Sequence, residues 1–223
     1  MSQDEFGRIS TFEDFNRVLP TTTISDATVI QYNNLTLAAV SGDTDAASTL
    51  DEAGGIMSFT GAGAAGDGIA IYQAPMRIDR NGTIVMGAKF KNSSATDFRC
   101  FVGWQEDVSA AEPVNPFTLS GTTLTDNDAG NVFGLYYDSG ATDDDFRAAG
   151  ANNGTIFTAS GTLGVKANAG TSSEGRITAD SYIIARVEID NDGTARAWIG
   201  YAANDPRGNG LALVDTLPSG NLS

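Results

Sequence analysis

The chain has 223 residues, with 13 Lys and Arg against 28 Asp and Glu, so its formal net charge is −15. An acidic surface repels phosphate backbones and anionic membrane leaflets, because both are bound mainly through basic side chains. We therefore expect no nucleic-acid partner and no membrane partner. Histidine is absent, which excludes Ser-His-Asp and Cys-His catalysis and the usual His-containing zinc sites.

The single cysteine, Cys100, has no second cysteine with which to form an intrachain disulfide. It lies in an apolar alternation with Phe98 and Val102, which favours a buried and unreactive thiol. The first five residues are acidic and lack the apolar stretch of a secretory signal. No run approaches the ~18 apolar residues of a membrane helix. We expect synthesis in a reducing cytoplasm.

The first twenty residues differ from the rest of the chain. Ser10-Thr11-Phe12-Glu13 is typical of a capping box, and Pro20 follows, so we predict a short helix from about Thr11 to Val18. Residues 1–20 then form an N-terminal helix or arm. Four apolar residues recur in it at intervals of three: Phe6, Ile9, Phe12 and Phe15. We interpret this stripe as a candidate partner-binding surface, the alternative being a segment docked on the chain's own sandwich.

From Thr21 onward, short apolar runs separated by glycines predict strands. Glycine makes up 26 of 223 residues, or about 12%, compared with a usual ~7%. This high content is typical of all-β folds with many turns. Alternation of apolar side chains predicts half-buried strands, and the run 132–137 is apolar on both faces, as in a central strand. The predicted strands are residues 29–40, 55–59, 69–72, 84–91, 98–104, 132–137, 182–189 and 195–201. Residues 106–130 and 138–145 are predicted to be excursion loops.

The clearest local signal is a hairpin from Tyr182 to Tyr201 around the turn Asn191-Asp192-Gly193. A loop of two or four residues would pair Val187 with Trp198 or Arg196. Both of these lie on the face opposite Ala197, so the apolar and polar faces would be mixed. A three-residue loop with a left-handed Gly193 keeps the apolar faces together, so we predict this loop. The expected pairs are Ile189 with Ala195, Glu188 with Arg196, Val187 with Ala197, Arg186 with Trp198, and Ala185 with Ile199.

Two segments match ligand-binding patterns only in part. Residues 61–66 read G-x-G-x-x-G, but a dinucleotide site needs a helix next, and residues 68–72 read as a strand. Residues 126–130 resemble the start of a calcium loop, yet the glycine comes one position early and no glutamate closes the site. We interpret 61–66 as a loop and 126–130 as an Asx-rich turn, and expect neither a cofactor nor a metal.

One acidic segment, residues 188–193, matches a catalytic motif only in part. The jelly-roll glucanases carry the strand motif E-x-D-x-x-E, because retaining glycosidases need two carboxylates about 5 Å apart. Glu188 and Asp190 supply the first two acids, but Gly193 stands where the third should be. We interpret the pair as a strand end and its hairpin, and expect no catalytic residues.

Several segments resemble the concanavalin A-like (laminin G-like) jelly-roll group. They are GGIMSFT at 54–60, DGIAIY at 67–72, GTIVMGAKFK at 82–91, DFRCFVGW at 97–104, and the 182–201 hairpin. In that group the last hairpin reads as an apolar strand, an acidic-Gly turn, an aromatic strand and a glycine. More narrowly, the order of pieces is similar to proteins of tailed bacteriophages that are thought to serve as virion components such as capsid decoration proteins.

The resemblance implies one two-sheet antiparallel jelly-roll sandwich over residues 21–223. It also implies a non-enzymatic virion structural protein, a decoration or cement subunit on the outer surface of a phage capsid after synthesis in the host cytoplasm. Its partners would be the major capsid protein, another virion protein or further copies of itself. The alternative is a carbohydrate-binding jelly-roll module, for example in a tail or receptor-binding protein, although the lectin metal and sugar residues are not matched. Candidate stacking platforms would be Trp104, Tyr136, Tyr137 and Trp198.

Overall fold

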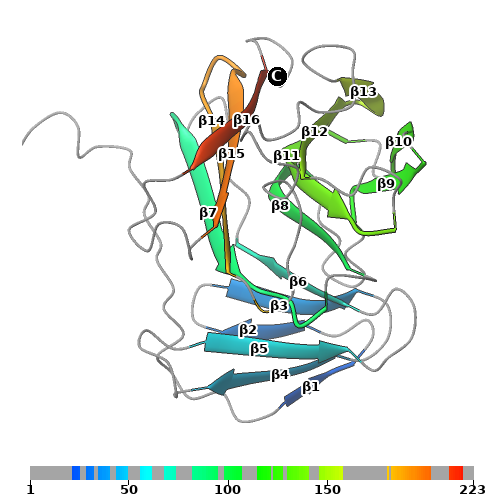
Figure 1. The fold of residues 1–223 in the computed structure, drawn as a ribbon, viewed down its shortest axis with the longest axis vertical. Coiled ribbons are helices and arrows are strands. Elements are labelled where there is room, and N and C mark those ends of the chain that lie inside the picture. Colours follow the sequence, from blue (N-terminus) through cyan, green and yellow to red (C-terminus); the bar gives the residue numbers. More distant parts are fainter. Residues whose placement is uncertain are drawn as a thin grey trace, which may run out of the picture. The chain divides into compact units, whose positions relative to one another are not determined.

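The structure is a computed structural model that describes residues 22–25, 29–32, 35–40, 44–49, 56–61, 68–73, 82–94, 98–106, 115–121, 123–127, 130–140, 146–157, 180, 182–201 and 211–217. All regular structure in these residues is β-strand, and every strand pairing is antiparallel (Figure 1). The chain is therefore an all-β protein, as predicted. No helix long and apolar enough to span a membrane was found among these residues.

The chain divides into two compact units. The first comprises Met1–Pro75 with Val108–Val114, and the second comprises Met76–Asp107 with Asn115–Ser223. The helix expected at Thr11–Val18 and the boundary expected between residues 20 and 21 lie outside the described residues. The helix and the domain division therefore stay predictions.

In its described residues, the first unit holds two three-stranded sheets. Their strands are β1 (Thr22–Ile24), β4 (Thr44–Thr49) and β5 (Ile56–Gly61) in one sheet, and β2 (Val29–Tyr32), β3 (Leu35–Val40) and β6 (Gly68–Tyr72) in the other. Side chains from both sheets share a small core around the fully buried Ile24 and Leu37. The run expected as one strand over residues 29–40 is a hairpin, in which Tyr32 pairs with Leu35. β1 and β4 were not expected.

The part of the second unit that the structure describes holds two four-stranded sheets and a two-stranded one. The first sheet has the order β16 (Ala212–Leu217), β15 (Ala195–Tyr201), β14 (Ile183–Ile189), β7 (Ile84–Phe90). The second has the order β13 (Thr155–Phe157), β12 (Arg147–Asn152), β11 (Val132–Asp138), β8 (Arg99–Gln105). The two-stranded sheet is the hairpin of β9 (Phe117–Ser120) and β10 (Thr123–Asp126).

The two four-stranded sheets of this unit pack face to face. One core cluster contains Leu135 and Tyr137 from β11 together with Val187 from β14 and Ile199 from β15, all almost completely buried. The unit is therefore a β-sandwich. Alternation along β7 is as expected, with Ile84 buried and Val85 exposed.

The hairpin β9–β10 corrects the excursion loop predicted for residues 106–130. Its strands are short and rich in threonine, but Phe117, Leu119 and Leu124 are buried against the outer face of the β8–β11–β12 sheet. That sheet is consequently covered on both faces, which explains why every residue of β11 is buried. It also explains why Phe101, on the face of β8 opposite Cys100 and Val102, lies in a second cluster beside Phe117.

The hairpin β14–β15 confirms the predicted register. Glu188 pairs with Arg196, and Ile189 with Ala195. Gly193 has a φ of 80°, and its N–H donates to the carbonyl of Asp190 at 3.0 Å, which closes the three-residue loop. The face made by Ile183, Ala185, Val187 and Ile189 is fully buried.

A first prediction concerns the turn of the β9–β10 hairpin. Ser120 pairs with Thr123, and Gly121 between them has a φ of 61° with nothing within 4 Å of an added Cβ. Replacement of Gly121 by alanine is therefore expected to lower the free energy of unfolding by about 1 kcal/mol, from backbone conformation alone. Asparagine, which tolerates this conformation, should cost less. Urea denaturation of both variants measures the difference, and equal costs would contradict the conformational explanation.

Candidate functional site

Glu188 and Asp190, the two acids of the partial glucanase motif, both contact cations of their own sheet. Glu188 accepts hydrogen bonds from the guanidinium of Arg186, with Nε at 2.8 Å. Asp190 Oδ2 lies 2.7 Å from Arg196 Nη1, and its Oδ1 accepts from Thr83 Oγ1 at 2.9 Å. The hydrogen bond to Asp190 raises the pKa of Arg196. The contacts of both acids thus hold the strand end and its hairpin.

The part of the calcium-like segment that the structure describes closes the β9–β10 hairpin. The side-chain amide of Asn127 donates to the carbonyl of Asn115 at 3.0 Å and to Thr118 Oγ1 at 2.8 Å. Its backbone N–H donates to the carbonyl of Pro116 at 2.8 Å. Asp128 and Ala129 lie outside the described residues. Within the described ranges, no group of three or more His, Cys, Asp or Glu residues is placed to hold a metal ion.

Three of the four aromatic residues considered as sugar platforms belong to the packing of the second unit. Tyr136 is 0% exposed and Tyr137 1% exposed. Trp104 is partly buried against the core between the two sheets, as is Cys100. Burial raises the pKa of the Cys100 thiol, in line with the unreactive cysteine expected. Trp198 differs, because it lies on the outer face of its sheet, where the Arg186 guanidinium is 5.8 Å from its ring centroid.

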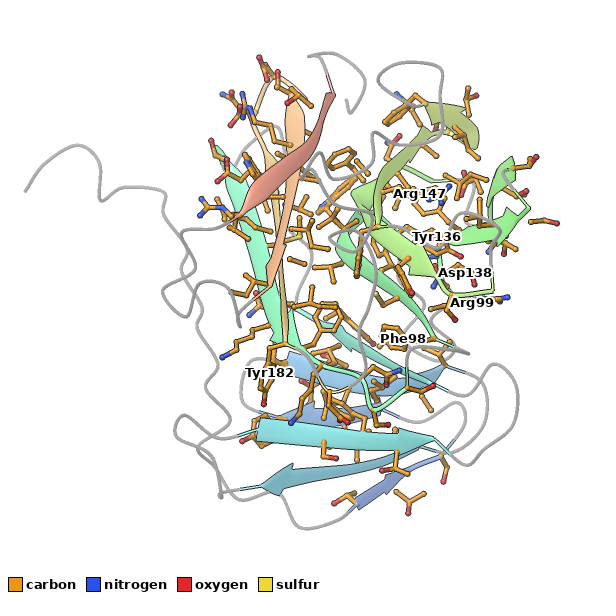
Figure 2. All side chains as sticks on the ribbon, viewed as in Figure 1. Phe98, Arg99, Tyr136, Asp138, Arg147 and Tyr182 are labelled. Atoms are coloured by element: carbon orange, nitrogen blue, oxygen red, sulfur yellow. The ribbon has the colours of Figure 1, made fainter. Side chains whose placement is uncertain are left out.

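A buried polar cluster joins the ends of β8 and β11 and was not predicted. Asp138 is 2% exposed, and its Oδ2 lies 2.8 Å from Arg99 Nε and accepts from the Tyr136 hydroxyl at 3.2 Å. Its Oδ1 accepts from the Gly140 N–H at 2.9 Å. Arg147, 5% exposed, lies directly across from Tyr136 on β12. Figure 2 labels the four side chains of this cluster on the second unit: Arg99, Tyr136, Asp138 and Arg147.

The environment of this cluster favours a structural role. Burial, and then the charge of Asp138, raises the pKa of the Tyr136 hydroxyl. The hydroxyl therefore stays protonated and donates to the carboxylate at neutral pH. Two hydrogen bonds between Ser139 and Phe98 close the same corner. The Ser139 N–H donates to the Phe98 carbonyl at 3.0 Å, and the Phe98 N–H donates to Ser139 Oγ at 2.9 Å. The cluster ties a turn to two strand ends. Its strand-end residues come from segments about 40 residues apart, so no local pattern reveals it.

A second group of charged and aromatic side chains lies on the outer face of the β7–β14–β15 sheet. Lys89 Nζ is 4.6 Å and Lys91 Nζ 4.9 Å from the ring centroid of Tyr182, which precedes β14. Both lysines are exposed. We refer to the following five residues as the cationic–aromatic face: Lys89, Lys91, Tyr182, Arg186 and Trp198.

Comparison with known proteins adds no relative to these observations. The chain matches no protein-family model, no curated protein and no solved structure. The partner-binding residues expected from the sequence lie outside the described residues: Phe6, Ile9, Phe12 and Phe15. The fold and the contacts of the described residues therefore carry the functional argument.

Proposed function

We propose that this chain is a non-enzymatic virion structural protein, a decoration subunit on the outer surface of a phage capsid, with a concanavalin A-like jelly-roll fold. The observation that carries the proposal is the use of its ordered carboxylates. Asp138, Glu188 and Asp190 each contact a cation and hold a strand end or a turn. Side chains arranged in this way stabilise a scaffold and leave recognition to its surfaces.

Composition and resemblance support the same role. A net charge of −15 keeps particles that carry many copies apart in solution, because like-charged surfaces repel. The second unit has a sandwich core built from two four-stranded sheets. A subunit of this kind folds before it attaches, and it attaches through a limited patch. We propose the major capsid protein as its partner.

The proposal is tested on purified particles of the phage that encodes the chain. Mass spectrometry should detect the protein in a fixed ratio to the major capsid protein, and a washed particle should keep it. Absence from particles would overturn the proposal, as would hydrolysis of a glycan by the purified chain.

A second prediction concerns the N-terminal arm. Deletion of Met1 to Leu19 is expected to abolish incorporation into particles and leave the melting temperature unchanged. Burial of a single Val, Leu, Ile or Phe side chain contributes about 1.5–3 kcal/mol, so the loss of even one such contact weakens binding about tenfold or more. Particle binding and thermal melting measure the two effects.

A variant of full length controls for the deletion itself. Replacement of Phe6, Ile9, Phe12 and Phe15 by serine keeps the chain length and should reproduce the loss of incorporation. A large fall in melting temperature in either variant would show that the segment belongs to the core, and the docking arm would then be wrong.

A further inference from the structure

Strand β7 forms one long edge of the second unit. Its sheet ends there, and β14 is the only strand paired with it in the part of the chain that the structure describes (Figure 1). β7 has seven residues and pairs with β14 over its full length. A strand with a neighbour on one side directs backbone N–H and C=O groups to the other side, where a further strand can pair with them. We call this side of the strand the β7 edge.

The sandwich core is only partly covered beside the β7 edge. On the interior strand β14, the inward-facing Val187 is completely buried, whereas Met86, which pairs with it, is only partly buried. Phe90, also on the inner face of β7, is partly buried as well, and its ring centroid lies 6.5 Å from that of Phe98. Phe98 directly precedes β8, the edge strand of the other sheet. Both sheets therefore end at a partly exposed apolar flank.

The features that protect the other edges are weak on β7. Natural edge strands are short, irregular or charged, which discourages pairing with other chains. Among the described edges of this unit, β13 has three residues, β16 shifts register against β15, and β8 begins with the exposed Arg99. β7 carries Lys89 of the cationic–aromatic face, whose Nζ lies 4.6 Å from the ring centroid of Tyr182. Because Tyr182 precedes β14, this ammonium group lies toward β14 and away from the β7 edge.

The sequence of β7 is complementary to itself in one antiparallel register. A twofold axis at Gly87 pairs all seven residues with those of a second copy: Ile84 with Phe90, Val85 with Lys89, Met86 with Ala88, and Gly87 with itself. The inner-face pairs are apolar, and no like charges lie opposite each other. A shift of one residue would mix the two faces, and a register that set Lys89 against its own copy would pair only residues 88–90.

This register also covers the most exposed of the large apolar side chains in the described residues. Val85 is 54% exposed on the outer face of β7. In the paired register it lies against the aliphatic stem of Lys89 from the second copy, and the charged end of that side chain stays in water. Symmetry provides this contact twice, because a twofold interface uses the same patch on both copies.

The size and charge of the joined ends predict a weak dimer. A seven-residue strand is about 23 Å long, and two stacked sheets with their side chains are about 20 Å deep, so the two ends bury about 900 Å² in total. That area is close to the ~1,000 Å² at which specific interfaces begin. The charge of −15 on each copy opposes association, and salt screens this repulsion. Dimerisation should therefore strengthen as salt is added.

We infer that the β7 edge is a twofold interface between two copies of this chain, in which β7 pairs antiparallel with its own copy about Gly87. The pairing makes one continuous sheet across the axis and covers the partly exposed flank of both cores. This inference rests on the described residues and not on the virion role, so a solution experiment and a particle experiment can fail separately.

The third prediction tests the register by disulfide cross-linking of the full chain. Gly87→Cys should give a covalent dimer under mild oxidation, because opposed residues of antiparallel strands have Cα atoms about 4.5–5.5 Å apart, within disulfide range. A Cβ at Gly87 meets only the Ala185 carbonyl oxygen, at an ordinary 3.6 Å, so the variant should fold. Electrophoresis without reductant measures the dimer, and the unaltered chain controls for Cys100.

Matched cysteines on the same exposed face separate this register from random collision. Val85→Cys alone and Lys89→Cys alone should stay monomeric, because each thiol lies about 13 Å along the strand from its own copy. A mixture of these two variants should cross-link, since the register places residue 85 opposite residue 89. Equal cross-linking of Val85→Cys and Gly87→Cys would overturn the inference, as would a mixture that fails to cross-link.

Two substitutions at Val85 separate local pairing from net charge. Val85→Lys places like charges opposite each other at Lys89 of the second copy and should weaken the dimer about two- to thirtyfold, counting two pairs per dimer. Val85→Glu should strengthen it. Net charge alone predicts the opposite order, because Val85→Lys makes the chain less acidic and Val85→Glu more acidic. Analytical ultracentrifugation over about 5–500 µM measures the dissociation constants, a range suited to a weak dimer, and circular dichroism verifies folding.

Three results would contradict the interface. The chain might stay monomeric at the highest concentration in high salt, or the two Val85 variants could follow net charge. The third is slow hydrogen exchange of every β7 amide in the dilute monomer, since a segment of the same chain would then cover the edge. Fast exchange of alternate β7 amides when dilute, and slower exchange when concentrated, is the expected result.

Discussion

Replacement of Gly134 by alanine is expected to lower the free energy of unfolding by about 3 kcal/mol, at the upper end of the usual cost of overpacking. A Cβ at Gly134 would lie 2.5 Å from the carbonyl oxygen of Val102 and 2.6 Å from the ring of Phe101. The carbonyl belongs to the neighbouring strand β8, so it moves only if the β8–β11 pairing distorts. The ring is fixed by its own packing, with its centroid 5.9 Å from that of Phe117.

The same substitution at Gly87 is the matched control. Its Cβ would have a single neighbour, the carbonyl oxygen of Ala185 at an ordinary 3.6 Å. Gly87→Ala should therefore change stability by less than about 0.5 kcal/mol, as surface substitutions usually do. Urea denaturation followed by circular dichroism measures both variants. Equal stability of the two would show that β8 and β11 do not approach as closely as the structure places them.

The glycine pair also shows how this sheet is organised. Gly103 and Gly134 lie directly opposite each other on β8 and β11, and the Phe101 ring covers both. An aromatic ring over a glycine pair replaces the missing side-chain contacts and fixes the register. The β9–β10 hairpin then packs on that ring through Phe117. The outer face of the β8–β11–β12 sheet therefore depends on the fit of the Phe101 ring over the two glycines as well as on the burial of apolar side chains.

The parts of the fold that the sequence predicted are those with strong local patterns. The 182–201 hairpin has seven-residue strands with strict alternation and a glycine at the one position that needs a positive φ. Its faces and loop therefore admit a single register. β11 is apolar from Val132 to Tyr137 because the β7–β14–β15–β16 sheet covers one of its faces and the β9–β10 hairpin covers the other. An unbroken apolar run of this kind indicates a strand that is buried on both faces.

The parts that were missed have weak local patterns and depend on tertiary contacts. β9 and β10 hold only three buried apolar residues among threonines. They form strands because these residues pack on the outer face of the β8–β11–β12 sheet, which would otherwise be exposed. β4 reads TDAAST, in which alternation of apolar residues is absent. The Asp138 cluster likewise joins residues from β8 and β11 that only the folded sheet brings together. Residue spacing carries no signal for such contacts.

Replacement of Asp138 by alanine is expected to lower the free energy of unfolding by about 3 kcal/mol, since a buried carboxylate with several donors is removed. The Gly140 N–H and the Tyr136 hydroxyl would each lose the acceptor that they contact in the native protein. The Arg99 side chain is 61% exposed and regains water, so it adds little to the loss. Asp138→Asn, which keeps an acceptor of the same shape, should cost less.

A double-mutant cycle with Tyr136→Phe separates the hydrogen bond from the rest of the cluster. Because Tyr136 and Asp138 are in direct contact and both buried, their substitutions should not be additive, with a coupling of about 1 kcal/mol. Arg99→Gln should couple to Asp138→Ala more weakly, since that pair is open to solvent on one side. Thermal and urea denaturation of the three single and two double variants, together with the unaltered chain, measure these coupling energies. Additive costs for Tyr136 and Asp138, or a loss below about 0.5 kcal/mol for Asp138→Ala, would show that the corner of β8 and β11 is held by its backbone bonds alone.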